Sequence, residues 1–174
     1  MNCDNASLLL YAVTDRSWLH GQTLYAQAEQ ALQGGATFLQ LREKELDEAH
    51  FKEEAIALKA LCKQYGVPFV LDDNVALAIE TDADGVHVGQ SDMAAGKVRE
   101  LIGPDKILGV SAQTVDEALL AEKCRAHFKN TLYAGRVLGG QRRDRTHGKY
   151  AIHGHGFQIG LNTGASAGIA SGDR

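Results

Sequence analysis

Short apolar runs alternate with amphipathic stretches along the first 123 residues of the chain. Each run is too short for a buried helix, and helical spacing of apolar residues follows it. Continuous apolar runs are typical of parallel strands, because neighbouring layers cover both faces of such a sheet. The pattern predicts strands at about 8–13, 37–41, 67–71, 85–88 and 106–110.

A helix is expected after each of these strands. The spacing predicts the first four helices at about 24–32, 51–62, 75–80 and 93–102. The fifth begins at Thr114, because Thr114 and Glu117 have the spacing of a capping box. Five strand–helix units in this order predict an α/β fold with a parallel sheet and right-handed crossovers.

The rhythm stops at about residue 124, and the composition changes with it. Residues 1–123 carry a net charge of -10 and residues 124–174 a net charge of +6, which together give the -4 of the whole chain. The last 51 residues contain no Glu and are rich in Gly. We therefore divide the chain into a domain over 1–123 and a divergent, basic, Gly-rich tail over 124–174, which we expect to be poorly ordered.

Length and composition exclude several classes of protein. The chain has 174 residues, of which 23% are charged and 44% hydrophobic, the proportions of an ordinary globular protein. No apolar run reaches the roughly 18 residues that a membrane helix needs. The first residues lack the features of a secretory signal, and three scattered cysteines indicate free thiols. We expect a cytoplasmic protein, with Cys62 in the core.

Polar residues gather where the predicted strands end. The carboxyl ends of parallel strands meet at one edge of a sheet, where binding sites of α/β proteins form. Seven side chains at these ends could bind a ligand: Gln40, Arg42, Lys44, Asp72, Asp73, Asp92 and Ser111.

The chemistry of these residues suits a pyrophosphate group and a divalent cation. Arg42 and Lys44 can bind phosphate oxygens. Asp73 and Asp92 lie on neighbouring predicted strands and could share Mg²⁺, which takes one or two carboxylates and completes its shell with water and phosphate. The alternative is that these are polar loop residues that cap helices, and the spacing alone leaves both interpretations open.

Five segments of the chain, in order and with matching spacing, resemble the thiamine-phosphate synthase (thiamine-phosphate pyrophosphorylase) family. The resemblance covers about 8–123, and the segments are Val13-Thr14-Asp15-Arg16, residues 35–44 (GATFLQLREK), Gly66-Val67-Pro68-Phe69, residues 83–92 (ADGVHVGQSD) and Gly109-Val110-Ser111-Ala112. It implies a (β/α)8 TIM barrel, and a transferase that couples hydroxymethylpyrimidine pyrophosphate with thiazole phosphate to give thiamine phosphate and pyrophosphate.

The resemblance also implies roles for the seven residues. Arg42 and Lys44 would bind the pyrophosphate, and Gln40 would contact the pyrimidine. Asp73 and Asp92 would hold Mg²⁺, and Ser111 would bind a phosphate oxygen. The family usually has Asn where this chain has Asp72, so a substrate contact becomes a carboxylate that either repels the substrate or recruits the metal.

The resemblance ends at Cys124, where the family would continue with a Gly-Ala-Asp-Tyr-like strand and a phosphate-binding loop. We interpret the break as a reading-frame shift or a recombined end. The tail offers two further interpretations, a metal site and a nucleic-acid contact, and we favour neither. Its cysteine and histidines match no standard zinc pattern, and its basic run lacks interleaved aromatic residues.

Five of eight units cannot close a barrel, so we expect an incomplete barrel whose first and fifth strands have unpaired edges. Full activity is then in doubt. The alternatives are a thiazole tautomerase-like paralogue, which needs no pyrophosphate or Mg²⁺ site, and a non-catalytic remnant. The expected partners are the small-molecule substrates, with no nucleic acid and no membrane, and a homo-oligomer is left open.

Overall fold

The computed structural model describes residues 3, 6–130, 149–154 and 157–162. It confirms the predicted alternation of strands and helices, with an added 3-10 helix (Arg16–Trp18) after the first strand. The strands of this part are β1 (Leu10–Thr14), β2 (Phe38–Leu41), β3 (Phe69–Asp72), β4 (Gly85–Val88) and β5 (Ile107–Ser111). The helices are α1 (Leu24–Gln33), α2 (Glu48–Tyr65), α3 (Val75–Glu80), α4 (Ala95–Ile102) and α5 (Val115–Lys123).

Local hydrogen bonds set the ends of the helices. Asp47 caps α2 by accepting a hydrogen bond from the His50 amide at 3.0 Å, and Gly66 ends it in a left-handed conformation with φ of 68°. The predicted capping box of α5 is confirmed, because the Thr114 hydroxyl and the Glu117 carboxylate each accept from the other residue's amide. The helix boundaries therefore follow from residues that the sequence shows directly.

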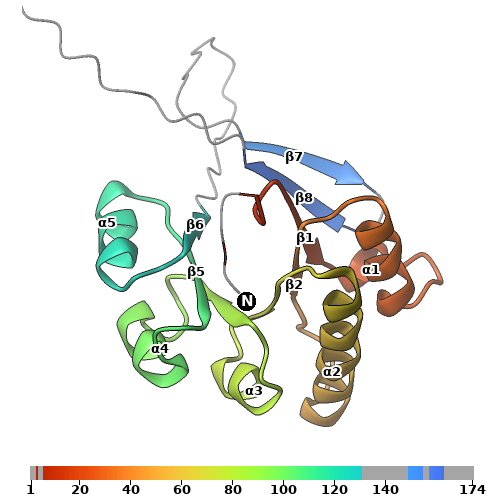
Figure 1. The fold of residues 1–174 in the computed structure, drawn as a ribbon, viewed down its shortest axis with the longest axis horizontal. Coiled ribbons are helices and arrows are strands. Elements are labelled where there is room, and N and C mark those ends of the chain that lie inside the picture. The colour runs from red at the N-terminus through yellow and green to blue at the C-terminus, as the bar shows by residue number, and fades with distance from the viewer. Residues whose placement is uncertain (1–2, 4–5, 131–148, 155–156, 163–174) are drawn as a thin grey trace, which may run out of the picture.

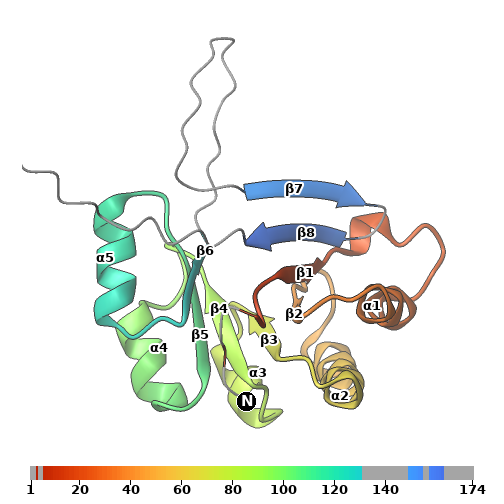
Figure 2. The same cartoon turned by 45° about the horizontal axis from the view of Figure 1, so that its top comes forward.

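The described strands form one sheet in the order β6-β5-β4-β3-β2-β1-β8-β7. Strands β1 to β5 and a short β6 (Phe128–Asn130) are parallel, whereas β7 (Lys149–Gly154) and β8 (Phe157–Asn162) form an antiparallel hairpin that pairs with β1 through β8. The parallel strands follow an arc, and the helices lie outside it (Figure 1). In the turned view, the hairpin continues the sheet beyond β1 (Figure 2).

The expectation that the first and fifth strands have unpaired edges is wrong. Strand β8 pairs with β1, and β6 pairs with β5. The tail also holds regular strands, for which the sequence did contain a signal: apolar residues alternate at 150 and 152 and again at 157, 159 and 161, the period of a strand. The rest of the tail, at 131–148, 155–156 and 163–174, lies outside the described residues, so the boundary at 123 stays a prediction.

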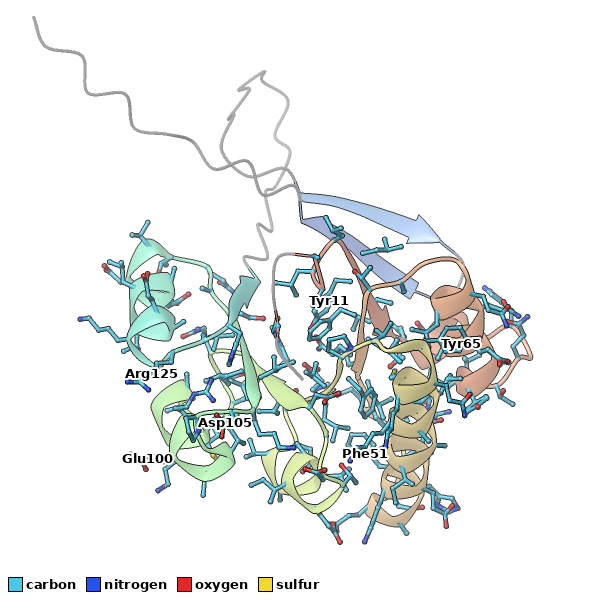
Figure 3. The ribbon with its side chains drawn as sticks, viewed as in Figure 1. Tyr11, Phe51, Tyr65, Glu100, Asp105 and Arg125 are labelled. Carbon is cyan, nitrogen blue, oxygen red and sulfur yellow. The ribbon has the colours of Figure 1, made fainter. Side chains whose placement is uncertain are left out.

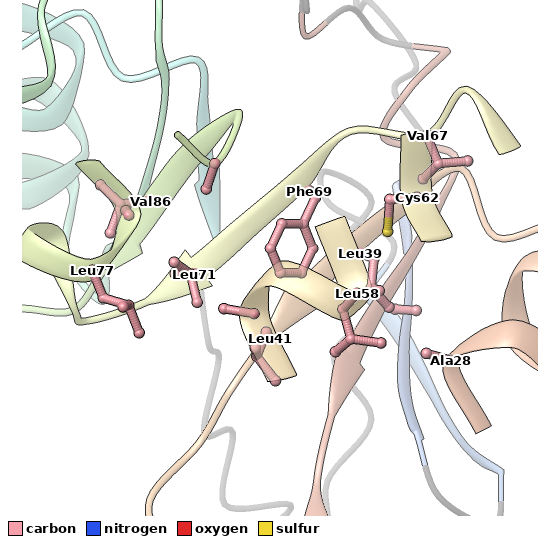
Figure 4. Packing of buried hydrophobic residues seen from close by; sticks show 14 of the residues in the cluster. Ala28, Leu39, Leu41, Leu58, Cys62, Val67, Phe69, Leu71, Leu77 and Val86 are labelled. Atoms are coloured by element: carbon pink, nitrogen blue, oxygen red, sulfur yellow. The ribbon is translucent and has the colours of Figure 1, made fainter. Parts of the chain in front are cut away.

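The sheet has an apolar layer on each face. The larger layer packs between the strands and the helices, where Leu58 and Cys62 of α2 meet side chains of β2 and β3 (Figure 4). Cys62 is 1% exposed, which confirms its place in the core, and all three cysteines are free thiols. On the opposite face, Tyr11 stacks on Phe38 with ring centroids 4.6 Å apart. Tyr11 thus lies inside the arc of strands (Figure 3).

Gly85 allows β4 and β5 to approach each other closely. A Cβ atom at this position would lie 2.0 Å from the Ile107 carbonyl oxygen, far inside van der Waals contact. The sheet therefore requires glycine here for a steric reason rather than for an unusual backbone angle.

Of the helices in the described part of the chain, none has the length and apolar character that crossing a membrane requires.

Candidate functional site

The carboxyl ends of β2, β3 and β4 bring six of the seven predicted site residues together. Gln40 is the third residue of β2, and Arg42 and Lys44 follow the strand. Asp72 ends β3 and Asp73 follows it, and their partners in the sheet are β2 and β4. The loop after β4 supplies the sixth residue, Asp92.

Lys44, Asp73 and Asp92 form the most closely paired group. The Lys44 ammonium donates to Asp73 Oδ2 at 2.6 Å, which raises the pKa of Lys44. Burial raises the pKa of Asp73, the Lys44 hydrogen bond opposes this rise, and a side-chain hydrogen bond with Asp92 adds to it. Asp92 Oδ2 also accepts from the Gly89 amide at 2.7 Å. Asp73 and Asp92 therefore lie close enough to share a cation.

Asp72 lies deeper and belongs to a chain of hydrogen bonds inside the sheet. The Tyr11 hydroxyl donates to Gln40 Oε1 at 2.5 Å, and Gln40 Nε2 donates to Asp72 Oδ1 at 2.6 Å. Burial, followed by the charge of Asp73, raises the pKa of Asp72 to about 6. Burial also raises the pKa of Tyr11 well above 10, so its hydroxyl keeps the proton that it donates. The Gln40 amide is therefore held in one orientation.

Arg42 lies at the open side of this group. Its guanidinium is 3.9 Å from Asp15 Oδ2 and 3.9 Å from Asp72 Oδ2, and its side chain is 43% exposed. Both separations are too long for a hydrogen bond. The main chain of Arg42 is fixed instead, because its amide donates to Thr14 Oγ1 at 2.9 Å. The partly exposed Arg42 guanidinium thus lies too far from both carboxylates to donate to them, and an anion could meet its donors.

Ser111 is connected to the group through β4. Its hydroxyl lies 2.9 Å from Nε2 of His87, and His87 is the sheet partner of Asp72. The Ser111 carbonyl accepts from Gln90 Nε2 at 2.6 Å, from the same loop that carries Asp92. The structure therefore places Ser111 at the same edge of the sheet, without a direct contact to the carboxylates among the described interactions.

The two-carboxylate arrangement fits a cation that binds few protein ligands. No group of three or more His, Cys, Asp or Glu side chains that could hold a metal occurs within the described segments. Mg²⁺ is commonly held by one or two carboxylates together with water and phosphate. Asp73 and Asp92 fit Mg²⁺ by this criterion.

Sequence reasoning missed three residues that organise the site. Tyr11 fixes Gln40, and it read only as part of an apolar run. Arg16 and Glu43 form an ion pair that links the loop after β1 to the loop after β2. Arg16 and Glu43 both lie in segments that resemble the family. The sequence feature that could have indicated their pairing is that each is a charged residue, of opposite sign, at the end of a predicted strand.

The capping alternative fails for Asp72. The side chain that caps α3 is Asn74, whose Oδ1 accepts from the Leu77 amide at 3.0 Å. Asp72 accepts from Gln40 instead, and Asp92 bonds its own loop.

Comparison with known proteins identifies the family to which the chain is similar. The family model described as thiamine monophosphate synthase matches residues 10–149, which extends past residue 123, where the sequence resemblance was expected to end. A thiamine-phosphate synthase from Clostridium acetobutylicum is 48% identical over 124 residues, which cover 71% of this chain and 59% of that protein. One from Caldanaerobacter subterraneus subsp. tengcongensis is 46% identical over 119 residues, 68% of this chain and 56% of that protein.

A solved structure gives the same result. The thiamine phosphate pyrophosphorylase from Pyrococcus furiosus superposes with a TM-score of 0.65 at 36% identity, over 71% of this chain and 59% of that chain. This chain thus spans less than two thirds of the length of the curated relatives that it matches. The extent of the family match and the identity to these relatives show that the chain belongs to the thiamine monophosphate synthase family.

Proposed function

We propose that this chain contains the pyrophosphate-binding part of a thiamine-phosphate synthase site. The reaction would join hydroxymethylpyrimidine pyrophosphate to a thiazole phosphate and release pyrophosphate. The observation that supports this proposal is the meeting of Arg42 and Lys44 with Asp73 and Asp92 at one edge of the sheet.

The chemistry of the proposed reaction explains why cationic and metal-binding side chains would be used to bind the pyrophosphate. Pyrophosphate leaves from a carbon attached to an electron-rich aminopyrimidine, so positive charge can develop on that carbon. The protein has to stabilise the leaving group and position the thiazole nitrogen. Arg42 and Lys44 would bind phosphate oxygens, and Ser111 would donate to one of them. The nitrogen nucleophile carries no proton, so the reaction needs no general base.

Gln40 would recognise the pyrimidine. Tyr11 and Asp72 each use one hydrogen-bonding group of its amide. One oxygen lone pair and one N–H remain for a ligand, and this pair complements the ring nitrogen and amino group of an aminopyrimidine. The orientation of the amide decides which side presents the donor.

The balance of charge supports a role for Mg²⁺. Asp72, Asp73 and Asp92 bring three carboxylates, against the two cations of Arg42 and Lys44. Bound by Asp73 and Asp92, Mg²⁺ would act as a Lewis acid that stabilises negative charge on the leaving pyrophosphate. Its two charges would offset the surplus of negative charge, which favours binding of a polyanionic ligand.

We also propose that the open sheet is the first part of a (β/α)8 barrel in a cytoplasmic enzyme. The parallel strands in an arc with helices outside them support this (Figure 1). Binding of the thiazole phosphate would require residues outside the stretch that matches the curated relatives. The tautomerase alternative is not favoured. Isomerising a thiazole requires neither a pyrophosphate site nor a metal site, so it would not use Arg42 and Lys44 or the carboxylates of Asp73 and Asp92.

The decisive measurement is formation of thiamine phosphate by the purified chain from both substrates, with Mg²⁺ and with EDTA. Full activity is not expected of this chain, but any thiamine phosphate that it forms with Mg²⁺ should fall at least about tenfold in EDTA and by a similar factor in Lys44→Met, which removes the cation and keeps the stem. Lys97→Met, an exposed site on α4, is the matched control. A folded chain with no turnover supports the non-catalytic alternative, and turnover unchanged in Lys44→Met contradicts the assigned site.

A further inference from the structure

The loop after β2 is organised around one buried carboxylate, Glu43. Its Oε1 accepts three consecutive main-chain amides, from Lys44 and Glu45 at 2.7 Å each and from Leu46 at 3.2 Å. The Glu43 side chain is 1% exposed. A carboxylate that accepts successive amides fixes the backbone of the loop, because each amide must point at the same atom.

The second oxygen of Glu43 is held from the neighbouring strand. Arg16, in the 3-10 helix after β1, donates from Nε to Glu43 Oε2, and its Nη2 donates to Glu54 Oε2 of α2 at 2.5 Å. Burial favours a raised pKa for Glu43, but the hydrogen bonds from the Glu45 amide, Arg16 and the Leu46 amide outweigh it and lower the pKa. Glu43 is therefore an ionised, fully bonded group, even though water does not reach it.

The buried carboxylate acts on the residue that follows it. Lys44 is joined to Glu43 through its amide and to Asp73 through its ammonium. Its backbone is set by Glu43, while its charged end lies in the candidate site. The Glu43 carboxylate contacts Arg16 and the loop amides, so the route from Glu43 to a ligand runs through the loop.

We infer that Glu43 is a positioning residue, which, with Arg16, holds the loop after β2 so that the Lys44 ammonium meets an anionic ligand between β2 and β3. This inference rests on the proposed function, because it assigns Glu43 to the pyrophosphate-binding part of that site. Removing a negative charge near an anion site should by itself strengthen anion binding. Positioning has the opposite consequence, since a loosened loop weakens it.

The test is the affinity for inorganic pyrophosphate with Mg²⁺, measured by isothermal titration calorimetry on the purified chain. For Glu43→Gln, which keeps the shape, we expect about tenfold weaker binding, the usual cost of losing a group that orients a ligand-binding residue. Glu45→Gln removes the same charge from an exposed position in the same loop. We expect this control to bind pyrophosphate equally or more tightly.

A double-mutant cycle with Lys44→Met separates positioning from a general loss of stability. If Glu43 acts through Lys44, Glu43→Gln should weaken binding only slightly once Lys44 is replaced. A merely structural role would lower the melting temperature and leave the affinity of folded protein unchanged. Equal or tighter binding by folded Glu43→Gln, or full additivity with Lys44→Met, overturns the inference.

If Glu43→Gln does not fold, Arg16→Lys replaces it in the same cycle. Lysine keeps the charge but replaces the planar fork of donors that bonds Glu43 and Glu54 with a single nitrogen, so we expect about threefold weaker binding. Unchanged affinity in Arg16→Lys then overturns the inference. If the unchanged chain binds pyrophosphate but forms no thiamine phosphate, the proposed reaction fails and the role of Glu43 is still decided by its variants. Absence of pyrophosphate binding by the unchanged chain contradicts both.

Discussion

The two ends of the parallel strands carry similar residues in opposite electrostatic situations. At the carboxyl end, burial raises the pKa of Asp72 to about 6, and the pKa of Asp73 is raised as well. At the amino end, hydrogen bonds from Lys106 and Lys59 lower the pKa of Asp82 to about 2. At the carboxyl end, acidic side chains lie close to one another. At the amino end, a single acidic side chain, Asp82, is paired with two lysines.

This difference separates stability from binding. An acid whose pKa is raised by the fold destabilises the folded chain when it ionises, whereas an acid whose pKa is lowered stabilises it. At the carboxyl end, the negative charges of Asp72 and Asp73 would be neutralised by a bound cation. At the amino end, the negative charge of Asp82 is already neutralised by lysine side chains of the chain itself. Substitutions of Asp72 at the carboxyl end and of Asp82 at the amino end should therefore change stability with opposite signs.

Asp72→Asn should give the largest effect, a gain in stability. The pKa of Asp72 is about 6 in the folded chain against 3.8 ordinarily. The folded chain holds this proton more tightly, so the stability present below about pH 4 is lost as the pH rises through about 6. Asparagine can still accept from Gln40 and carries no charge. We expect the free energy of unfolding at pH 7 to rise by up to about 3 kcal/mol.

Urea unfolding of both proteins between about pH 4 and pH 8, in EDTA, measures this gain. The difference between them should be small at pH 4 and grow to its full value above pH 6. Asp105→Asn, which removes a carboxylate from an exposed site at the amino end (Figure 3), is the control. If the free energies of unfolding of Asp72→Asn and the unchanged chain differed by the same amount at every pH, the raised pKa of Asp72 would be contradicted.

Arg99→Met should give the next largest effect, a loss of stability at the amino end. The Arg99 guanidinium donates to the carbonyl oxygens of Gly103 at 2.6 Å, Lys106 at 2.8 Å and Arg125 at 2.8 Å. The Arg99 guanidinium therefore supplies hydrogen bonds to main-chain carbonyl groups in the segments that follow α4 and α5. Methionine keeps the apolar stem but leaves these acceptors to water. We expect a loss of about 2 kcal/mol in the free energy of unfolding.

The matched control for this loss is Arg125→Met, since the Arg125 side chain is exposed near α5 (Figure 3) and only its carbonyl takes part. Removing this second cation also relieves its repulsion on Arg99, which contributes to the lowered pKa of Arg99 after the larger effect of burial. The control should therefore unfold at the same urea concentration as the unchanged chain or slightly higher. Equal losses in both variants would show that charge, rather than the carbonyl contacts, matters.

The sequence predicted the core of the fold and most of the site, for reasons that are local. Apolar runs and capping residues such as Asp47 and Thr114 act on their own segment, so their effect can be read without the rest of the chain. The meeting of Lys44 with Asp73 followed from the rule that parallel strands end at one edge. The roles of Gln40, Ser111 and Mg²⁺ stay predictions.

What the sequence did not predict depends on pairs of residues far apart in it. Glu43 and Arg16 are 27 positions apart, and nothing in either segment shows that the carboxylate turns inward to collect three amides. Tyr11 and Gln40 are 29 positions apart and meet because both lie on the inner face of adjacent strands. The pairing of β8 with β1 was missed because a change in charge was given more weight than an alternating apolar pattern.

Asp82→Asn should give the smallest effect, with the opposite sign to Asp72→Asn. Asp82 lies 3.2 Å from Lys59 Nζ and 2.5 Å from Lys106 Nζ, but its side chain is 76% exposed. Water screens exposed ion pairs, so we expect a loss of less than about 1 kcal/mol in the free energy of unfolding at pH 7. The lowered pKa gives a contribution that is present above about pH 4 and lost as the pH falls through about 2.

Salt separates the ion pair from other consequences of Asp82→Asn. Asp82 has φ of 52°, a conformation that asparagine tolerates as well as aspartate does, so the backbone is not strained by the change. The loss should therefore be measurable by urea unfolding at low salt and vanish near 1 M NaCl, where the screening length falls to about 3 Å. A gain in stability at low salt would show that the amino end is crowded with charge like the carboxyl end, and that the two ends do not differ.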